Sequence, residues 1–178
     1  MLISALLRAK ELAAKGVELF ASPALRFFLC NKIDKDEFYK NPVCLDNFIQ
    51  LDDNDIWTSL KVWCNHPDIV LSTLSQGLVN RKLFKVEVLS SPISPTRKEE
   101  ILQKISQQLN ISKKEANYFF STSLIENNMY RKEDDSIEIL FNDGTTQNIA
   151  DASDMLNISL LSRKVKKYYV CFLRFNGF

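Results

Sequence analysis

The sequence predicts an α+β fold, with an N-terminal region of about four helices followed by a lobe of strands and helices. In the first half, apolar residues recur with the period of about 3.6 residues that marks one face of a helix, as in residues 56–63. In the second half they alternate, as in "LFKVEVL" at residues 83–89, which is the period of a strand. We therefore expect two domains, a helical region over residues 1–82 and a mixed lobe over residues 83–178.

Three helices of the first half have recognisable starts. Ser22 is an expected N-cap, and the Pro23 that follows it loses nothing by lacking an N–H at the first helical position. Asp52 is the expected cap of the next helix, whose first turn is acidic and therefore complements the helix dipole. A further helix restarts at Pro67.

The rest of the first half has weaker signals. Residues 2–20 keep a helical period, but no N-cap precedes them and their apolar side chains cover more than one face. We interpret this as a helix whose upstream sequence has been cut away, and the alternative is an ordinary N-terminal core helix. The stretch "NKIDKDEFYKNPVC" at residues 31–44 is polar and contains Pro42, which predicts a mobile loop.

The second half follows the order β-α-β-β-α-β of the ferredoxin-like split unit. A capping box of Thr96 and Glu99 is expected to start its first helix. In its first strand, Lys85 is expected on the outward face, opposite the apolar side chains. The expected strands are residues 83–89, 116–126, 136–141 and 168–175, and the expected helices are residues 96–110 and 151–167.

Composition excludes several classes of function. The net charge is only +1, so no broad electrostatic field attracts nucleic acid or a membrane surface. No apolar run approaches the roughly 20 residues that a bilayer span requires. The four cysteines are widely spaced and contain no C-x-x-C pair, which indicates reduced, mostly buried thiols of a cytoplasmic protein. The four glycines form neither G-x-G-x-x-G nor a Walker loop.

Catalytic and metal-binding groups are scarce. His66 is the only histidine, and its place before Pro67 is typical of a residue in a cap region. The acidic run from Asp52 to Asp55 lacks the glycine and the closing glutamate of a calcium loop, so we interpret it as helix capping. The sequence therefore predicts no catalytic residue, no metal ligand and no cofactor in this chain.

Two basic stretches remain as candidate binding sites. "SRKVKKYY", with cations at residues 163–167 beside Tyr168 and Tyr169, could bind a nucleic-acid backbone or simply complete a solvated helix end. "NRKLFK" places Arg81 and Lys85 four residues apart across an expected helix–strand junction. The two cations could form a solvated rim, or they could converge on one polyphosphate.

The segments "FIQLDDNDIWTSL" and "HPDIVLSTLSQGLVNRKLFKVEV" resemble the HD-domain deoxynucleoside triphosphate triphosphohydrolases. The similarity is most specific over residues 48–88, where "RKLFK" matches the family's R-x-L-[FY]-K motif. Residues 1–47 resemble helices that follow the catalytic domain, and residues 115–178 loosely resemble the C-terminal lobe. Related members use this motif to bind regulatory nucleotide phosphates at subunit interfaces, a role that the resemblance assigns to Arg81 and Lys85.

The same family builds its metal site from a histidine, a His-Asp pair and a later aspartate, all upstream of the matched region. The resemblance therefore implies the C-terminal region of such an enzyme without its HD core, inactive alone, with the divalent metal in the missing domain. The implied partners are that HD domain, further copies of the chain and a nucleotide effector; neither a membrane nor a nucleic acid is expected. The alternative is a stand-alone ferredoxin-like module that binds RNA or a protein through residues 163–169.

Overall fold

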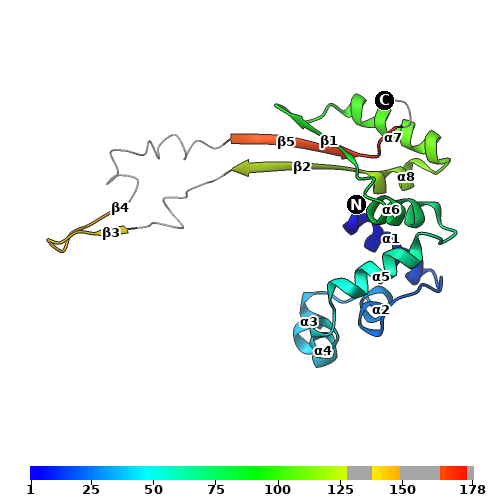
Figure 1. Cartoon of the computed structure of the whole chain (residues 1–178), viewed down its shortest axis with the longest axis horizontal. Coiled ribbons are helices and arrows are strands. Elements are labelled where there is room, and N and C mark those ends of the chain that lie inside the picture. Colours follow the sequence, from blue (N-terminus) through cyan, green and yellow to red (C-terminus); the bar gives the residue numbers. More distant parts are fainter. Residues whose placement is uncertain (128–137, 149–164, 176–178) are drawn as a thin grey trace. The chain divides into compact units, whose positions relative to one another are not determined.

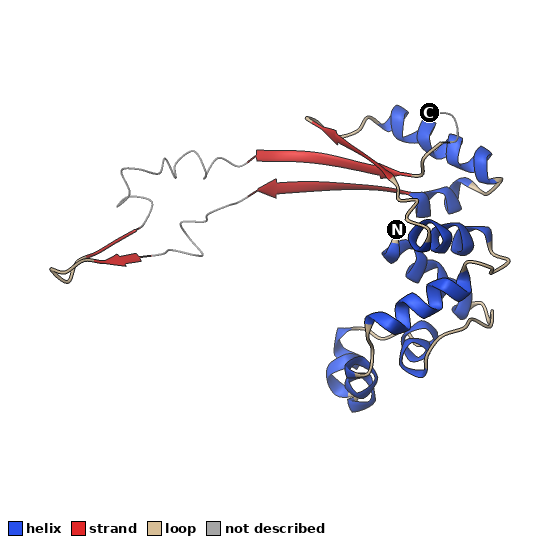
Figure 2. Ribbon diagram, viewed as in Figure 1, coloured by secondary structure: helices blue, strands red, loops and turns tan. Residues whose placement is uncertain are grey.

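The computed structural model confirms the α+β class, and it describes residues 1–127, 138–148 and 165–175 (Figure 1). Residues 1–82 are built of helices alone, while strands begin at Lys85 (Figure 2). The helices of this first part are α1 (Leu2–Ala14), α2 (Pro23–Cys30), α3 (Lys35–Lys40), α4 (Pro42–Ile49), α5 (Asp53–Trp63) and α6 (Ile69–Val79). The elements that follow are β1 (Lys85–Leu89), α7 (Pro95–Leu109), α8 (Lys113–Ala116), the 3-10 turn η1 (Asn117–Phe119), β2 (Phe120–Asn127), β3 (Glu138–Leu140), β4 (Thr146–Asn148) and β5 (Val165–Phe172).

The chain divides into two compact units. The first contains Met1–Glu87, Ser94–Ser121 and Val170–Phe178, and the second contains Val88–Ile93 and Thr122–Tyr169. The first unit therefore takes residues from both sides of the predicted boundary at 82/83.

The core of the first unit lies where α1 and α5 pack against α6. Leu60 and Trp63 of α5 are both 1% exposed, which confirms the apolar stripe predicted for that helix. On α6, Leu71 and Leu74 are fully buried and lie about one helical turn apart, so they share one face of that helix. The indole N–H of Trp63 donates a 2.9 Å hydrogen bond to the carbonyl oxygen of Phe20, so its one polar atom is satisfied.

The predicted N-caps of α2 and α5 are confirmed. Ser22 accepts a hydrogen bond from the Leu25 backbone N–H, and Pro23 occupies the first helical turn. Asp52 accepts from the backbone N–H of Asp55, whose side chain in turn accepts from the backbone of Asp52, closing a capping box.

Other helix boundaries differ from prediction. α6 starts one residue after Asp68, whose carboxylate accepts from the Leu71 N–H, and not at Pro67. α7 starts at Pro95 behind Ser94, which accepts from the Arg97 N–H, so the predicted Thr96/Glu99 capping box is wrong. In both cases an Asp or Ser just upstream offers a side-chain acceptor that satisfies an orphan N–H.

The helix predicted over residues 2–20 ends at Ala14. Gly16 adopts a φ of +80°, a left-handed conformation that glycine reaches without a steric penalty, and this turns the chain out of the helix. The helix has Met1 at its N-cap position and no side-chain cap. Its buried face consists of Ala5, Arg8, Ala9 and Leu12.

The loop predicted for residues 31–44 is wrong, because this segment forms α3 and the start of α4. Asp34 caps α3 by accepting a 2.9 Å hydrogen bond from the Glu37 N–H. Asn41 caps α4 by accepting a 3.1 Å bond from the Val43 N–H, with Pro42 at the first helical position. Proline at this position starts a helix as readily as it ends one, and composition alone did not distinguish the two roles.

The strands form two sheets in the described part of the chain. One is three-stranded with the order β1-β5-β2, and the other pairs β3 with β4 in antiparallel register, Ile139 opposite Gln147. The four predicted strands are thus present, although β2 starts only at Phe120 because residues 116–119 lie in α8 and η1. In the described part of the chain they do not form the single four-stranded sheet of a ferredoxin-like unit. Of the helix expected over residues 151–167, residues 151–164 lie outside the described residues. Its last three residues, Val165, Lys166 and Lys167, belong to β5 instead.

A buried arginine connects α1 to two later helices. Arg8 is 6% exposed, and its guanidinium donates to Asp68 at the start of α6, with Nη2 to Oδ2 at 2.6 Å. The same Nη2 donates to Glu115 of α8 at 2.9 Å, and Nη1 donates to Glu11 at 3.0 Å. The hydroxyl of Tyr118 donates to Glu11 at 2.6 Å. This network joins segments more than 100 residues apart within the first compact unit.

The network makes the free energy of unfolding depend on pH at the acidic end of the scale. Hydrogen bonds from Lys15, Tyr118 and Arg8 lower the pKa of Glu11 from 4.5 to about 2. Because this pKa is depressed in the folded chain, the stabilisation is complete above pH 4.5 and is lost as the pH falls through about 2. We expect urea unfolding to show a loss of about 1–2 kcal/mol from this group across that window, allowing for solvent screening. Glu11→Gln should flatten the curve, and an unchanged slope would contradict the assignment.

Candidate functional site

A cavity of about 330 Å³ in the first compact unit surrounds Lys85. It is bordered by the start of β1, by one face of α7 and by the end of β5 with the residues after it. The lining residues are Lys85, Glu87, Arg97, Glu100, Ile101, Lys104, Phe172, Arg174 and Phe175. Four of these carry positive charge and two carry negative charge, so the cavity has a net charge of +2 in a chain whose total is +1.

Glu87 fixes two of the cations. Its Oε1 lies 3.0 Å from the ammonium of Lys85, and its Oε2 lies 2.5 Å from Nη2 of Arg97. The Glu87 side chain is 20% exposed, whereas the side chains of the two cations are about half exposed. Glu87 therefore holds Lys85 and Arg97 in place while neutralising only one of their two charges.

The other two cations are positioned without a carboxylate. Arg174 donates from Nε to the carbonyl oxygen of Leu83 at 3.0 Å, and the ammonium of Lys104 lies 5.9 Å from the centre of the Phe175 ring. Neither makes an ion pair with a carboxylate of the described residues. Arginine and lysine held by a carbonyl and a ring keep their full charge available to an anion.

The apolar part of the cavity consists of two aromatic rings and Ile101. Phe172 is 4% exposed, and its ring lies 5.7 Å from that of Phe175. The ammonium of Lys85 lies 5.8 Å from the centre of Phe172, within cation–π range. A cavity with net positive charge and aromatic walls suits a small phosphorylated ligand that also offers a flat or apolar group.

The two residues singled out in the sequence occupy different places. Lys85 lines the cavity, whereas Arg81 is exposed in the turn after α6 and is not among the lining residues. Arg81 has a φ of 56°, and its backbone N–H donates to the Leu78 carbonyl oxygen at 3.2 Å, which closes that turn. No interaction of the described residues joins the two side chains, so a shared phosphate remains a prediction.

The strand itself also differs in part from expectation. Phe84 is buried as expected, but Val86 and Val88 are 55% and 56% exposed. The face that carries Lys85 and Glu87 is the one that faces α7 across the cavity. The alternation of side chains along β1 is therefore as predicted. After Phe84, however, the face with Lys85 and Glu87 borders the cavity, and the face with Val86 and Val88 is exposed.

The sequence analysis did not predict three of the four cations that line the cavity, Arg97, Lys104 and Arg174. Arg97 and Lys104 are seven residues apart on α7, and Ile101 lies between them on the same helical face, so the helical period could have paired them. Arg174 follows a strand, and nothing in its local sequence predicts that it returns to β1.

The other candidates have structural roles. His66 is half-buried, and its Nδ1 accepts a 3.0 Å hydrogen bond from the Asp68 backbone N–H, which confirms its position in a cap. All four cysteines are free, and only Cys44 is buried: Cys64 and Cys171 are half-buried and Cys30 is exposed, so the expectation of mostly buried thiols is wrong. Arg163 and Lys164 of the second basic stretch lie outside the described residues, and binding through that stretch stays a prediction. In the part of the chain that the structure describes, no helix has the length and the hydropathy that a membrane span requires.

Comparison with known proteins relates the chain to a phosphohydrolase. No protein-family model matches it, and no curated protein matches it. A solved structure does match: the crystal structure of a phosphohydrolase from Bacteroides thetaiotaomicron VPI-5482, with 68% sequence identity and a TM-score of 0.92. The match covers 97% of this chain and 43% of that one, so the chain spans less than half the length of the phosphohydrolase.

Proposed function

We propose that this chain acts as the C-terminal accessory region of an HD-superfamily nucleotide phosphohydrolase of the deoxynucleoside triphosphate triphosphohydrolase type. The observation that carries the proposal is the 68% identity to less than half of a phosphohydrolase. The family resemblance of residues 48–88 supplies the finer assignment, and it puts the metal-binding catalytic core in the remaining part of the enzyme. A site of the H…HD…D type needs two histidines, and this chain has one.

In this proposal the accessory region assembles with further copies of itself and binds a regulatory nucleotide through its phosphates. The cavity that Lys85 lines supports such a role, because its net charge of +2 is opposite in sign to that of a triphosphate and attracts it. Lys104 and Arg174 supply cations that make no ion pair with a described carboxylate, and Phe172 and Phe175 supply rings. Arg81 would reach the ligand from the neighbouring turn, or from a second copy at an interface between subunits.

The isolated chain is expected to bind inorganic triphosphate without hydrolysing nucleotides. Calorimetric titration should show binding that weakens as salt rises, because the exposed cations are screened. Incubation with deoxynucleoside triphosphates and Mg²⁺ or Mn²⁺ should release no triphosphate. Turnover that disappears in His66→Ala would contradict the accessory role, and salt-dependent binding of single-stranded RNA in place of triphosphate would favour an RNA-binding module.

A further inference from the structure

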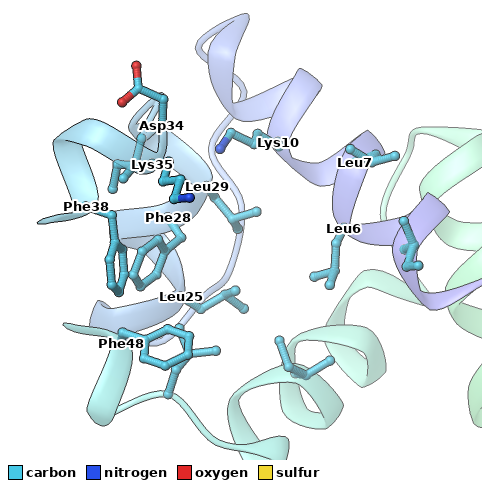
Figure 3. Close-up of a pocket in the computed structure, with 14 residues that line it drawn as sticks. Leu6, Leu7, Lys10, Leu25, Phe28, Leu29, Asp34, Lys35, Phe38 and Phe48 are labelled. Atoms are coloured by element: carbon cyan, nitrogen blue, oxygen red, sulfur yellow. The ribbon is translucent and has the colours of Figure 1, made fainter. Parts of the chain in front are cut away.

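An apolar cavity lies on the helical part of the first compact unit, and it shares no lining residue with the cationic cavity. It measures about 610 Å³ and is lined by α1, α2, the α3 segment, the end of α4 and α5. In Figure 3, Phe28, Phe38 and Phe48 stand on one side, and Leu6 and Leu7 of α1 stand on the other. We call this the α1–α4 groove.

The groove is almost entirely apolar. Of its 14 lining residues only Lys10, Asp34 and Lys35 carry charge, and the carboxylate of Asp34 points away from the three aromatic rings (Figure 3). A site for a small polar metabolite has several polar groups converging on its ligand. The groove has no such set, and its shape and chemistry suit the apolar face of a helix.

Large apolar side chains of the groove remain in contact with water in this chain. Ile3 is 74% exposed, Leu7 55% and Phe48 58%. The exposed apolar surface continues beyond the groove along α4, where Ile49 is 72% exposed and Leu45 51%. Soluble proteins rarely leave contiguous apolar surface of this kind uncovered, and it commonly marks the place where another protein segment packs.

The rings of the groove are already arranged to receive such a segment. Phe38 and Phe48 pack edge to face with centroids 5.6 Å apart, and Phe28 packs edge to face with Phe48 at 6.5 Å. The three rings come from three helices, so α2, α3 and α4 jointly fix the aromatic wall. A preformed wall lowers the ordering cost of docking.

We infer that the α1–α4 groove is the surface on which the remaining, catalytic part of the phosphohydrolase docks, through a helix with an apolar face and acidic flanks. The related phosphohydrolase has more than half of its chain outside the match, which is enough to supply a covering domain. Lys10 and Lys35 on the rim, against one Asp34, favour acidic side chains beside the docked apolar face. This inference rests on the accessory role proposed above.

The test uses two proteins: the 178-residue chain itself, and a chimera in which it replaces the matched part of the Bacteroides thetaiotaomicron phosphohydrolase. Leu7→Glu puts a charge into the groove, and Leu124→Glu makes the same change at an exposed leucine of the second compact unit, 45% exposed, outside the groove. In the isolated chain both variants should keep the melting temperature, because both leucines face water. In the chimera Leu7→Glu should lower the melting temperature by about 5 °C or more, and Leu124→Glu should not.

The outcomes separate the inference from the proposed function. A chimera that is folded and active, and that tolerates Leu7→Glu as well as Leu124→Glu, overturns the docking surface and leaves the accessory role standing. A chimera that folds but has no phosphohydrolase activity overturns the accessory role and the inference with it. An isolated chain that forms dimers, which Leu7→Glu dissociates, identifies a second copy as the occupant and also overturns the inference.

Discussion

Arg8→Ala is expected to lower the free energy of unfolding by about 3–5 kcal/mol, the cost of breaking a buried ion pair by removing one partner. The guanidinium makes close contacts with Asp68, Glu11 and Glu115, and it is 6% exposed. Its removal takes the cation from Asp68 and Glu115 and leaves Glu11 with Lys15 alone, around a largely buried position. Urea unfolding at pH 7, followed by circular dichroism, measures the loss.

The design of the variants separates charge from packing. Arg26→Ala is the control, because Arg26 is an exposed arginine whose side chain makes one described hydrogen bond, to the Leu19 carbonyl oxygen. We expect this variant to change the stability by less than about 1 kcal/mol. Arg8→Met keeps the aliphatic stem but should still be destabilising. Adding Asp68→Asn to Arg8→Met should recover part of the loss, since asparagine removes a stranded charge and can still cap α6. Equal stability of Arg8→Ala and Arg26→Ala would contradict the structural role of the network.

The local features of the fold were predictable from sequence because they depend on neighbouring residues. Ser22 and Asp52 start helices through side-chain acceptors three residues or fewer from the N–H groups they satisfy. The strand at β1 follows from alternation over a few residues. Where the prediction failed locally, as at Pro42, the same residue type is compatible with both a loop and a helix start.

The long-range features were not predictable in this way. Arg8 reads as an exposed cation on an N-terminal helix, yet its partners Asp68 and Glu115 lie 60 and 107 residues away. The cationic cavity likewise depends on the return of Arg174 to Leu83, 91 residues upstream. Lys85 was found because a family motif marks it, whereas Arg97, Lys104 and Arg174 belong to no motif and become neighbours of Lys85 only in the folded chain.

Lys85→Glu is expected to weaken the binding of inorganic triphosphate by about ten- to a hundredfold. A hydrogen bond to a charged group contributes about 1.5–3 kcal/mol, and a factor of ten in affinity corresponds to about 1.4 kcal/mol. The glutamate would also face Glu87, which lies 3.0 Å from the present ammonium, and would add repulsion toward the anion. Lys61→Glu makes the same charge change at an exposed lysine of α5 that does not line the cavity, and it should leave the affinity unchanged.

Changing the partner of the same ion pair should act in the opposite direction. Glu87→Gln releases Lys85 and Arg97 from the carboxylate that holds both, so triphosphate should bind about tenfold more tightly at low salt, with the gain shrinking at high salt. Arg81→Glu should weaken binding by less than Lys85→Glu, because Arg81 is outside the lining and acts over a longer distance. Calorimetry at two salt concentrations measures all four variants. Unchanged affinity in both Lys85→Glu and Glu87→Gln would reduce these cations to a solvated rim, whereas opposite shifts would assign the ligand's phosphates to the cavity that Glu87 organises.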